Sequence, residues 1–126
     1  MTEIRFEAIV PKHKISAASA REVMLLMRKM GRFTQAKLQK YPPPPPASGY
    51  RRTGTLGRNW TTEGPSALGN DLVVKVGNKV KYGPYVQGLQ QTRQHKKTGW
   101  PRIDKTGKEE WDKVQPEIQR ALQKTP

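Results

Sequence analysis

Side chains able to carry out catalysis are few and scattered in this sequence. The two histidines, His13 and His95, both stand in basic, turn-like surroundings, and neither has a carboxylate close in sequence to orient its imidazole ring. Histidine serves in catalysis or metal binding when a neighbouring group holds the ring in one orientation. We therefore expect both to be solvated surface residues, and we expect the chain not to be an enzyme.

Other catalytic and ligand-binding patterns are equally weak. The acidic residues mostly alternate with basic ones or stand at expected helix starts, unlike the clustered carboxylates of a metal cage or an acid–base pair. The chain has no cysteine, so it has no disulfide framework and no thiolate site. Glycine-rich phosphate loops of the known patterns are also absent from the sequence. We expect no cofactor and no bound metal.

Positive charge is the dominant property of the chain. It has 24 Lys and Arg against 10 Asp and Glu, a formal net charge of +14. Such a charge attracts nucleic acid, anionic membranes or acidic protein surfaces. No stretch approaches the roughly 20 apolar residues needed to cross a bilayer, so we expect no membrane partner and synthesis in the cytoplasm.

Basic and aromatic residues alternate in two places, as they often do on surfaces that bind single strands of nucleic acid. One group lies around residues 50–60 and the other around residues 93–100; their members are Tyr50, Arg51, Arg52, Arg58 and Trp60, and Arg93, His95, Lys96, Lys97 and Trp100. Charged runs are usually solvated faces and aromatic residues in strands are usually core. A small basic nucleic-acid-binding protein is therefore one alternative that stays open.

The elements of the first third can be predicted from hydrophobic periodicity. Apolar residues alternate with charged ones over residues 4–8, which predicts a strand that Pro11 ends. Ser19 and Glu22 have the capping-box spacing and predict a helix start. Gly31 inside this helix is expected to mark close packing. The helix is amphipathic, with an apolar stripe formed by Val23, Leu26, Met27, Met30, Phe33 and Leu38.

Five consecutive prolines end this helix and separate it from the sheet. Proline lacks an N–H and fixes φ near −65°, so such a run forms a stiff, extended polyproline II segment. We interpret residues 41–54 as a proline-rich arm that reaches toward a partner. The arm contains Tyr41, Pro42, Pro43, Pro44, Pro45, Pro46, Tyr50, Arg51 and Arg52.

An antiparallel meander is predicted after the arm. Residues 55–62 read as a strand weakened by Gly57, and residues 63–70 as a loop. Residues 71–76 are the clearest strand, with Leu72, Val74 and Val76 pointing inward. Gly77 and Asn78 then predict a two-residue turn that returns the chain antiparallel over residues 79–82.

The last third is predicted to hold a short helix, a loop and a closing helix. Pro84 suits the first turn of the short helix. Residues 88–106 form a long basic loop in this interpretation. Thr106 and Glu109 have capping-box spacing, and Pro116 is expected to kink the helix that follows. The apolar positions of that helix are Trp111, Val114, Ile118 and Leu122.

Together these elements predict a single α+β domain over residues 1–126. Its antiparallel sheet has about four strands, packed by a long helix in the N-terminal half and by a C-terminal helix. With 33% hydrophobic residues the core is small, and both long excursions are expected to find their partner surfaces on neighbouring subunits. The expected partner-contact residues are Tyr41 to Pro46, Tyr50, Arg51, Arg52, Arg93, His95, Lys96, Lys97 and Trp100.

An ordered set of motifs carries a family resemblance. The motifs are Lys40-Tyr41-Pro42-Pro43-Pro44, Tyr50-Arg51-Arg52-Thr53-Gly54-Thr55-Leu56 with Trp60, Val80-Lys81-Tyr82-Gly83-Pro84-Tyr85-Val86-Gln87-Gly88, and Thr98-Gly99-Trp100. In this order the middle half of the chain resembles the head–tail joining, or tail-completion, proteins of tailed phages, which are often described as minor tail components. The segment from Gln87 to Gln90 departs from the acidic-aromatic-Gly continuation that is more usual in that family.

The resemblance implies a structural virion protein that joins the tail to the head as a ring at the neck. It implies a hexamer or a dodecamer, with the hexamer favoured, and neighbours among the portal-side or tail-tube proteins. A ring uses heterologous contacts whose rotation closes, so that the same two patches repeat around the axis. The basic loops would then face acidic neighbours or the DNA that passes through the lumen.

Overall fold

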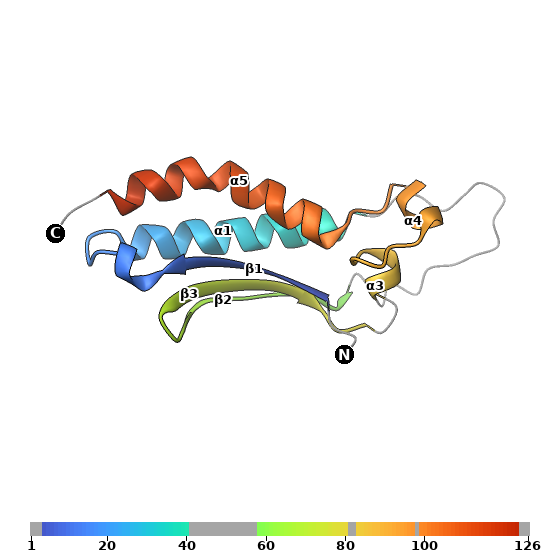
Figure 1. Cartoon of the computed structure of the whole chain (residues 1–126), viewed down its shortest axis with the longest axis horizontal. Helices are drawn as coiled ribbons and strands as arrows, with labels where there is room; N and C mark the ends of the chain where they lie inside the picture. The colour runs from blue at the N-terminus through green and yellow to red at the C-terminus, as the bar shows by residue number, and fades with distance from the viewer. Residues whose placement is uncertain (1–3, 41–57, 81–82, 98, 124–126) are drawn as a thin grey trace.

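Two long helices lie on one face of a three-stranded antiparallel sheet (Figure 1). The computed structural model describes residues 4–80 and 83–123 except 41–57 and 98, and for residues 94 and 95 it describes the backbone alone. The predicted α+β class is confirmed. The strands run along the long axis of the molecule. Helices α1 and α5 run along the same axis and lie above the sheet in this view.

The sheet consists of β1 (Ile4–Pro11), β2 (Trp60–Leu68) and β3 (Asp71–Asn78) in the order β1-β3-β2. Both neighbours of the central strand β3 are antiparallel to it. The predicted inward positions of β3 are confirmed, because Leu72, Val74 and Val76 are buried. β1 supplies the N-terminal strand that the alternation predicted, and it ends at Pro11 as expected.

The predicted turn at Gly77 and Asn78 is wrong. Both residues belong to β3, where Asn78 stands opposite Ile4 of β1 and Trp60 of β2. The N-terminal strand β1 therefore takes the place beside β3 that the sequence assigned to residues 79–82. Residues 79 and 80 are not in a strand, and residues 81 and 82 lie outside the described part. The described residues thus form three strands rather than about four.

The hairpin of this sheet lies at the other end of β3, between β2 and β3. Gly69 and Asn70 make its turn, and Gly69 has a left-handed φ of 60°. The predicted bounds of the strand at 55–62 and the loop at 63–70 are wrong, because β2 runs from Trp60 to Leu68. Residues 55–57 lie outside the described part. Gly64 and Pro65 indicated a loop from sequence, but the strand passes through them with a bulge between Glu63 and Ser66.

Helix α1 (Ala20–Leu38) lies directly on the sheet. Close approach is required at Gly31, where a Cβ atom would stand 2.7 Å from Cγ2 of Thr62, so the packing predicted for this glycine is confirmed. The predicted apolar stripe is buried at Val23, Met27, Met30 and Leu38. The prediction for Phe33 is wrong, since 51% of its surface is exposed.

The expected capping box at the start of α1 is also wrong. Ser19 stands at the N-cap but its side chain makes no cap bond to the helix. Its Oγ instead accepts a 3.0 Å hydrogen bond from the backbone N–H of Ser16. The hydroxyl of Ser19 therefore bonds within a local serine turn and does not cap the helix.

Helix α5 (Ile103–Leu122) lies against α1 and over β1. It begins three residues before Thr106, so the capping box predicted at Thr106 and Glu109 is wrong and Thr106 is buried inside the first turns. Val114 and Ile118 are buried as expected, and Pro116 lies inside the helix. The early start also shortens the predicted loop 88–106.

Two short helices complete the described chain at one end of the molecule (Figure 1). The helix predicted at Pro84 is confirmed as α3 (Gly83–Val86), and α4 (Arg93–Lys97) lies within the segment predicted to be a loop. A short 3-10 helix, Lys12–Lys14, follows β1. Within the described part of the chain, no helix combines the length and apolarity that crossing a membrane requires.

Candidate functional site

Several described elements meet at one end of the molecule, which we call the basic end. α1 and β3 finish there, β2 and α5 begin there, and α3 and α4 project from it (Figure 1). A separate buried cluster closes the core behind this end; its members are Ile4, Leu38, Trp60, Val76 and Ile103. The apolar cluster provides a rigid base for the segments that project beyond it.

Gln87, directly after α3, attaches this base to the projecting segment. Its side chain is fully buried, and its amide nitrogen donates a 2.8 Å hydrogen bond to the carbonyl of Leu38. Its own backbone carbonyl accepts a 2.7 Å bond from the N–H of Ile103 at the start of α5. The carbonyl of Leu38 belongs to the last turn of α1, where no intrahelical donor exists. Gln87 therefore joins α1, α3 and α5 at one point.

Further hydrogen bonds hold α4 against the same end. The N–H of Thr92 donates to the carbonyl of Tyr85 at 2.9 Å. The side-chain amide of Gln91 donates to the carbonyls of Val86 and Trp100, at 2.7 and 3.0 Å. Both ends of the segment that carries α4 are thus fixed, and the helix is presented outward.

The basic end carries positive charge with little opposing charge. No acidic residue occurs between Glu22 and Glu63 or between Asp71 and Asp104, and these two stretches provide the segments that meet at this end. Asp104 is already engaged by Arg102, whose Nη2 lies 2.6 Å from Oδ2. Exposed cations in and beside the ends of the converging elements include Lys40, Arg58, Lys79, Arg93, Lys96, Lys97 and Lys105.

The acidic residues collect elsewhere, on α5. Five of the ten lie between Ile103 and Leu122. One of them, Glu110, is buried and forms ion pairs with Lys37 of α1 and, at 3.4 Å, with Lys113. Burial disfavours the charged carboxylate, but these cations outweigh it and lower the pKa of Glu110. The bond to Glu110 in turn raises the pKa of Lys37, so this pair holds α1 to α5.

The predicted partner-contact residues are only partly within the described structure. Arg93, Lys96 and Lys97 are exposed on α4, as a contact surface requires. His95 lies in α4, and its side chain is outside the description; Trp100 is half-buried. The residues predicted in the arm lie outside the described part: Tyr41, Pro42, Pro43, Pro44, Pro45, Pro46, Tyr50, Arg51 and Arg52. The described residues that flank the arm, Lys40 and Arg58, adjoin the elements of the basic end.

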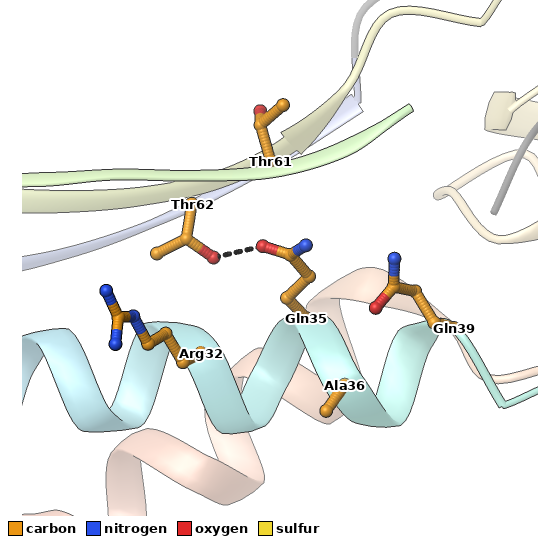
Figure 2. Close-up of a pocket in the computed structure, with 6 residues that line it drawn as sticks. All are labelled: Arg32, Gln35, Ala36, Gln39, Thr61 and Thr62. Atoms are coloured by element: carbon orange, nitrogen blue, oxygen red, sulfur yellow. Dashed lines mark hydrogen bonds between the residues drawn. The ribbon is translucent and has the colours of Figure 1, made fainter. Parts of the chain in front are cut away.

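A second candidate surface, which the sequence did not indicate, is a groove between α1 and β2 (Figure 2). It has a volume of about 420 Å³ and is open to solvent. Its lining residues are Arg32, Gln35, Ala36, Gln39, Thr61 and Thr62. Sequence reasoning missed it because Arg32 reads as part of the solvated helix face and the two threonines as the end of a strand.

Hydrogen bonds give this groove a defined floor. The hydroxyl of Thr62 donates to Oε1 of Gln35 at 2.5 Å, and the amide nitrogen of Gln35 donates to the carbonyl of Trp60 at 3.2 Å. Gln35 is thereby held between the helix and the strand, while Arg32 and Gln39 flank it along α1 (Figure 2). The groove offers a guanidinium, amides and hydroxyls, which together suit a carboxylate or another polar planar group.

The metal-binding side chains in the described part of the chain do not cluster. Among the described residues, no group of three or more His, Cys, Asp or Glu side chains is placed to hold a metal ion. His13, on the 3-10 helix after β1, is exposed. What the described residues do offer is binding: a cationic end and a polar groove.

Searches against protein-family models, curated protein sequences and solved structures found no match to this chain.

Proposed function

We propose that this chain is a non-enzymatic structural protein of a tailed bacteriophage, a ring subunit at the neck that joins the tail to the head. The observation that carries the proposal is the convergence of the proline-rich segment's flanking residues with α4 at the basic end. The two stretches of sequence that we expect to contact partners are therefore joined to the folded core at the same end.

This arrangement suits a subunit that reaches its neighbours from one end. A polyproline segment is already extended before it docks, so it loses little conformational entropy on binding. Exposed Arg93, Lys96 and Lys97 would meet acidic surfaces of portal-side or tail-tube proteins, or the DNA in the lumen. A hexamer is the ring that the resemblance favours, and a dodecamer is the alternative.

The test is electron microscopy and native mass spectrometry of the purified full-length chain, together with protein identification in purified virions. The proposal expects closed rings, alone or with a neck neighbour, and the chain among the virion proteins. A strictly monomeric chain that is absent from particles would overturn it.

A small nucleic-acid-binding protein is the second candidate, and the exposed cations of the basic end favour it. Its affinity for duplex or single-stranded DNA would fall with salt, by about 0.9 logarithmic units per logarithmic unit of salt for each duplex phosphate contacted. Substituting Arg93, Lys96 and Lys97 by Gln would remove about three phosphate contacts and make the salt dependence of the affinity correspondingly less steep. No retention of either form of DNA at low salt would exclude this function.

A further inference from the structure

Three arginines and a leucine form one row on the exposed side of α1. Arg21, Leu25, Arg28 and Arg32 are all exposed, and they follow one another at spacings of four, three and four residues. At 3.6 residues per turn, these positions lie within about 60° of one another around the helix axis and extend along about 16 Å of it. These four residues, which we call the arginine row, therefore face solvent as one continuous stripe.

The arginine row has no opposing charge in the described part of the chain. None of its three guanidinium groups takes part in an ion pair or a hydrogen bond with a described residue. Cations on other elements are paired: Lys75 lies 3.4 Å from Glu63 in the sheet, and Lys108 lies 3.0 Å from Asp112 on α5. The described fold thus leaves three adjacent arginines of one helix available to carboxylates of another molecule.

Large apolar side chains accompany these arginines. Leu25 is 54% exposed within the row, and Met24 and Phe33, on its two sides, are 37% and 51% exposed. The Nζ atom of Lys29 lies 5.6 Å from the centre of the Phe33 ring. The cores of protein–protein interfaces are enriched in aromatic residues, Met and Arg, whereas contacts with a phosphate backbone come from basic and polar groups. The composition of this face therefore favours a protein partner over nucleic acid.

A second copy of the chain does not supply the complementary surface in its described part. Five of the ten acidic residues lie on α5, and one of them, Glu110, is buried. The strand carboxylates of Glu7 and Glu63 pair with cations of the sheet itself. The exposed side of α5 also carries four cations, Lys105, Lys108, Lys113 and Arg120. The acidic row that would match the arginine row therefore belongs to a different protein.

We infer that the arginine row of α1 docks an acidic amphipathic helix of another protein. That helix lies along α1 and places carboxylates against Arg21, Arg28 and Arg32, with an apolar side chain against Leu25. Alternating spacings of three and four residues bring side chains together when two helices pack lengthwise. The planar guanidinium group binds a carboxylate through two parallel hydrogen bonds. The inference goes beyond the proposed function, since it requires neither a ring nor a virion.

The test begins with a displayed library of single-helix peptides, randomised along their length and selected against the immobilised full-length chain. The expected result is a pool enriched in Asp or Glu at spacings of three and four residues, with an apolar residue in the same row. A selected peptide is then synthesised and titrated into ¹⁵N-labelled protein, where the amide shifts are expected to fall on residues 21–33. A pool without this acidic pattern, or shifts confined to α4 or α5, would overturn the inference.

Three variants at exposed positions measure what the arginine row contributes. Arg28→Gln should weaken binding of the selected peptide by about tenfold, because a charge-assisted hydrogen bond is lost. Leu25→Ala should weaken it by about fivefold, because the apolar contact is lost. Arg120→Gln removes the same charge as Arg28→Gln from an exposed position of α5 and should change the affinity less than about twofold. Unchanged unfolding midpoints of all three variants are the control for folding.

The variants also separate this inference from its alternatives. Equal losses in Arg28→Gln and Arg120→Gln would overturn it, because they indicate diffuse attraction to a basic chain. An unchanged affinity in Leu25→Ala would overturn it as well, because the contact would then depend on charge alone. Duplex DNA is tested as a competitor of the peptide. Competition by DNA whose affinity falls in Arg28→Gln, together with peptide binding that is insensitive to Leu25→Ala, would assign the face to nucleic acid instead.

Discussion

The side chain of Gln87 donates a 2.8 Å hydrogen bond to the carbonyl of Leu38, 49 residues earlier in the chain. This bond caps the last turn of α1 with a group from the turn after α3. The amide oxygen of the same side chain is buried and has no hydrogen-bond partner in the described part of the chain. The side chain of Gln87 therefore leaves one buried polar atom unpaired, while its other polar atom fixes the basic end to α1.

Replacing Gln87 by Ala should destabilise the protein by about 1–2 kcal/mol. The carbonyl of Leu38 loses its donor in a buried setting, a loss partly offset by removal of the unpaired amide oxygen. Denaturant unfolding measures the change. Gln119→Ala, an exposed substitution of the same type on α5, should stay within about 0.5 kcal/mol. Equal effects of the two variants would contradict the role given to Gln87.

Gly107 is predicted to tolerate no side chain. A Cβ atom there would stand 2.4 Å from Cγ of Phe6, whose ring packs on this point of α5. Gly107→Ala gains up to about 1 kcal/mol of helix propensity, but forcing a methyl group into a filled core costs about 1–3 kcal/mol. With the full propensity gain subtracted, we expect a net loss of up to about 2 kcal/mol in the free energy of unfolding.

The control for Gly107 is a double-mutant cycle with Phe6→Leu. If the ring is the obstacle, Gly107→Ala should cost at least about 0.5 kcal/mol less when Phe6 has been replaced. Additive effects would show that the backbone of α5, and not Phe6, resists the change.

The Lys37–Glu110 pair should make stability depend on acid pH. The folded pKa of Glu110 lies below the ordinary 4.5, so its contribution is present above that value and is lost as pH falls through the folded pKa. The folded pKa of Lys37 lies above 10.5, so its contribution persists up to that pH and is lost only at higher values. At neutral pH, Glu110→Gln should cost about 1–2 kcal/mol, a modest figure because Lys37 is partly exposed.

Thermal or denaturant unfolding between pH 7 and pH 3 measures this dependence. The difference in the free energy of unfolding between the natural chain and Glu110→Gln should become smaller as the pH falls below 4.5. Glu117→Gln, at an exposed position of α5, should show a gap near zero throughout. A constant gap for Glu110→Gln would mean that shape rather than charge accounts for its effect.

Replacing Pro42 to Pro46 with Gly and Ser should leave the isolated fold nearly intact and impair assembly. The sequence-based reason is that the stiffness of a polyproline segment matters only when the segment docks on a partner. Unfolding midpoints of the isolated chain and the yield of rings under identical conditions are the two measurements. Unfolding of the substituted chain would contradict this prediction, because the prolines would then belong to the chain's own core.

Local periodicity was enough to predict α1, β1 and the inward face of β3, because each depends on residues a few positions apart that the amphipathic pattern records directly. The short helix was predicted from Pro84 alone, since proline suits the first turn of a helix. The α+β class followed from the same elements. For the candidate site, the sequence likewise indicated the cations of α4, because their exposure follows from a stretch with almost no apolar residues to bury.

Pairing over long distances was decided only by the tertiary structure. Gly77 and Asn78 match a turn locally, yet β1, more than 60 residues earlier, competes for the edge of β3 and extends that strand through them. Gly64 and Pro65 match a loop, yet the hairpin continues through a bulge because β3 supplies the partner strand. Such choices depend on which strand is available elsewhere in the fold, and no local pattern contains that information.

The same distinction holds for function. The sequence by itself determined a basic chain with two cationic, proline- or glutamine-containing excursions and without recognisable catalytic motifs. Only the tertiary structure brought the segment that carries α4 to the end where α1 finishes, through the bond between Gln87 and Leu38. Only the tertiary structure placed Arg32 of α1 and Thr62 of β2 on the two sides of one groove, because a site between a helix and a strand exists only once the two have packed.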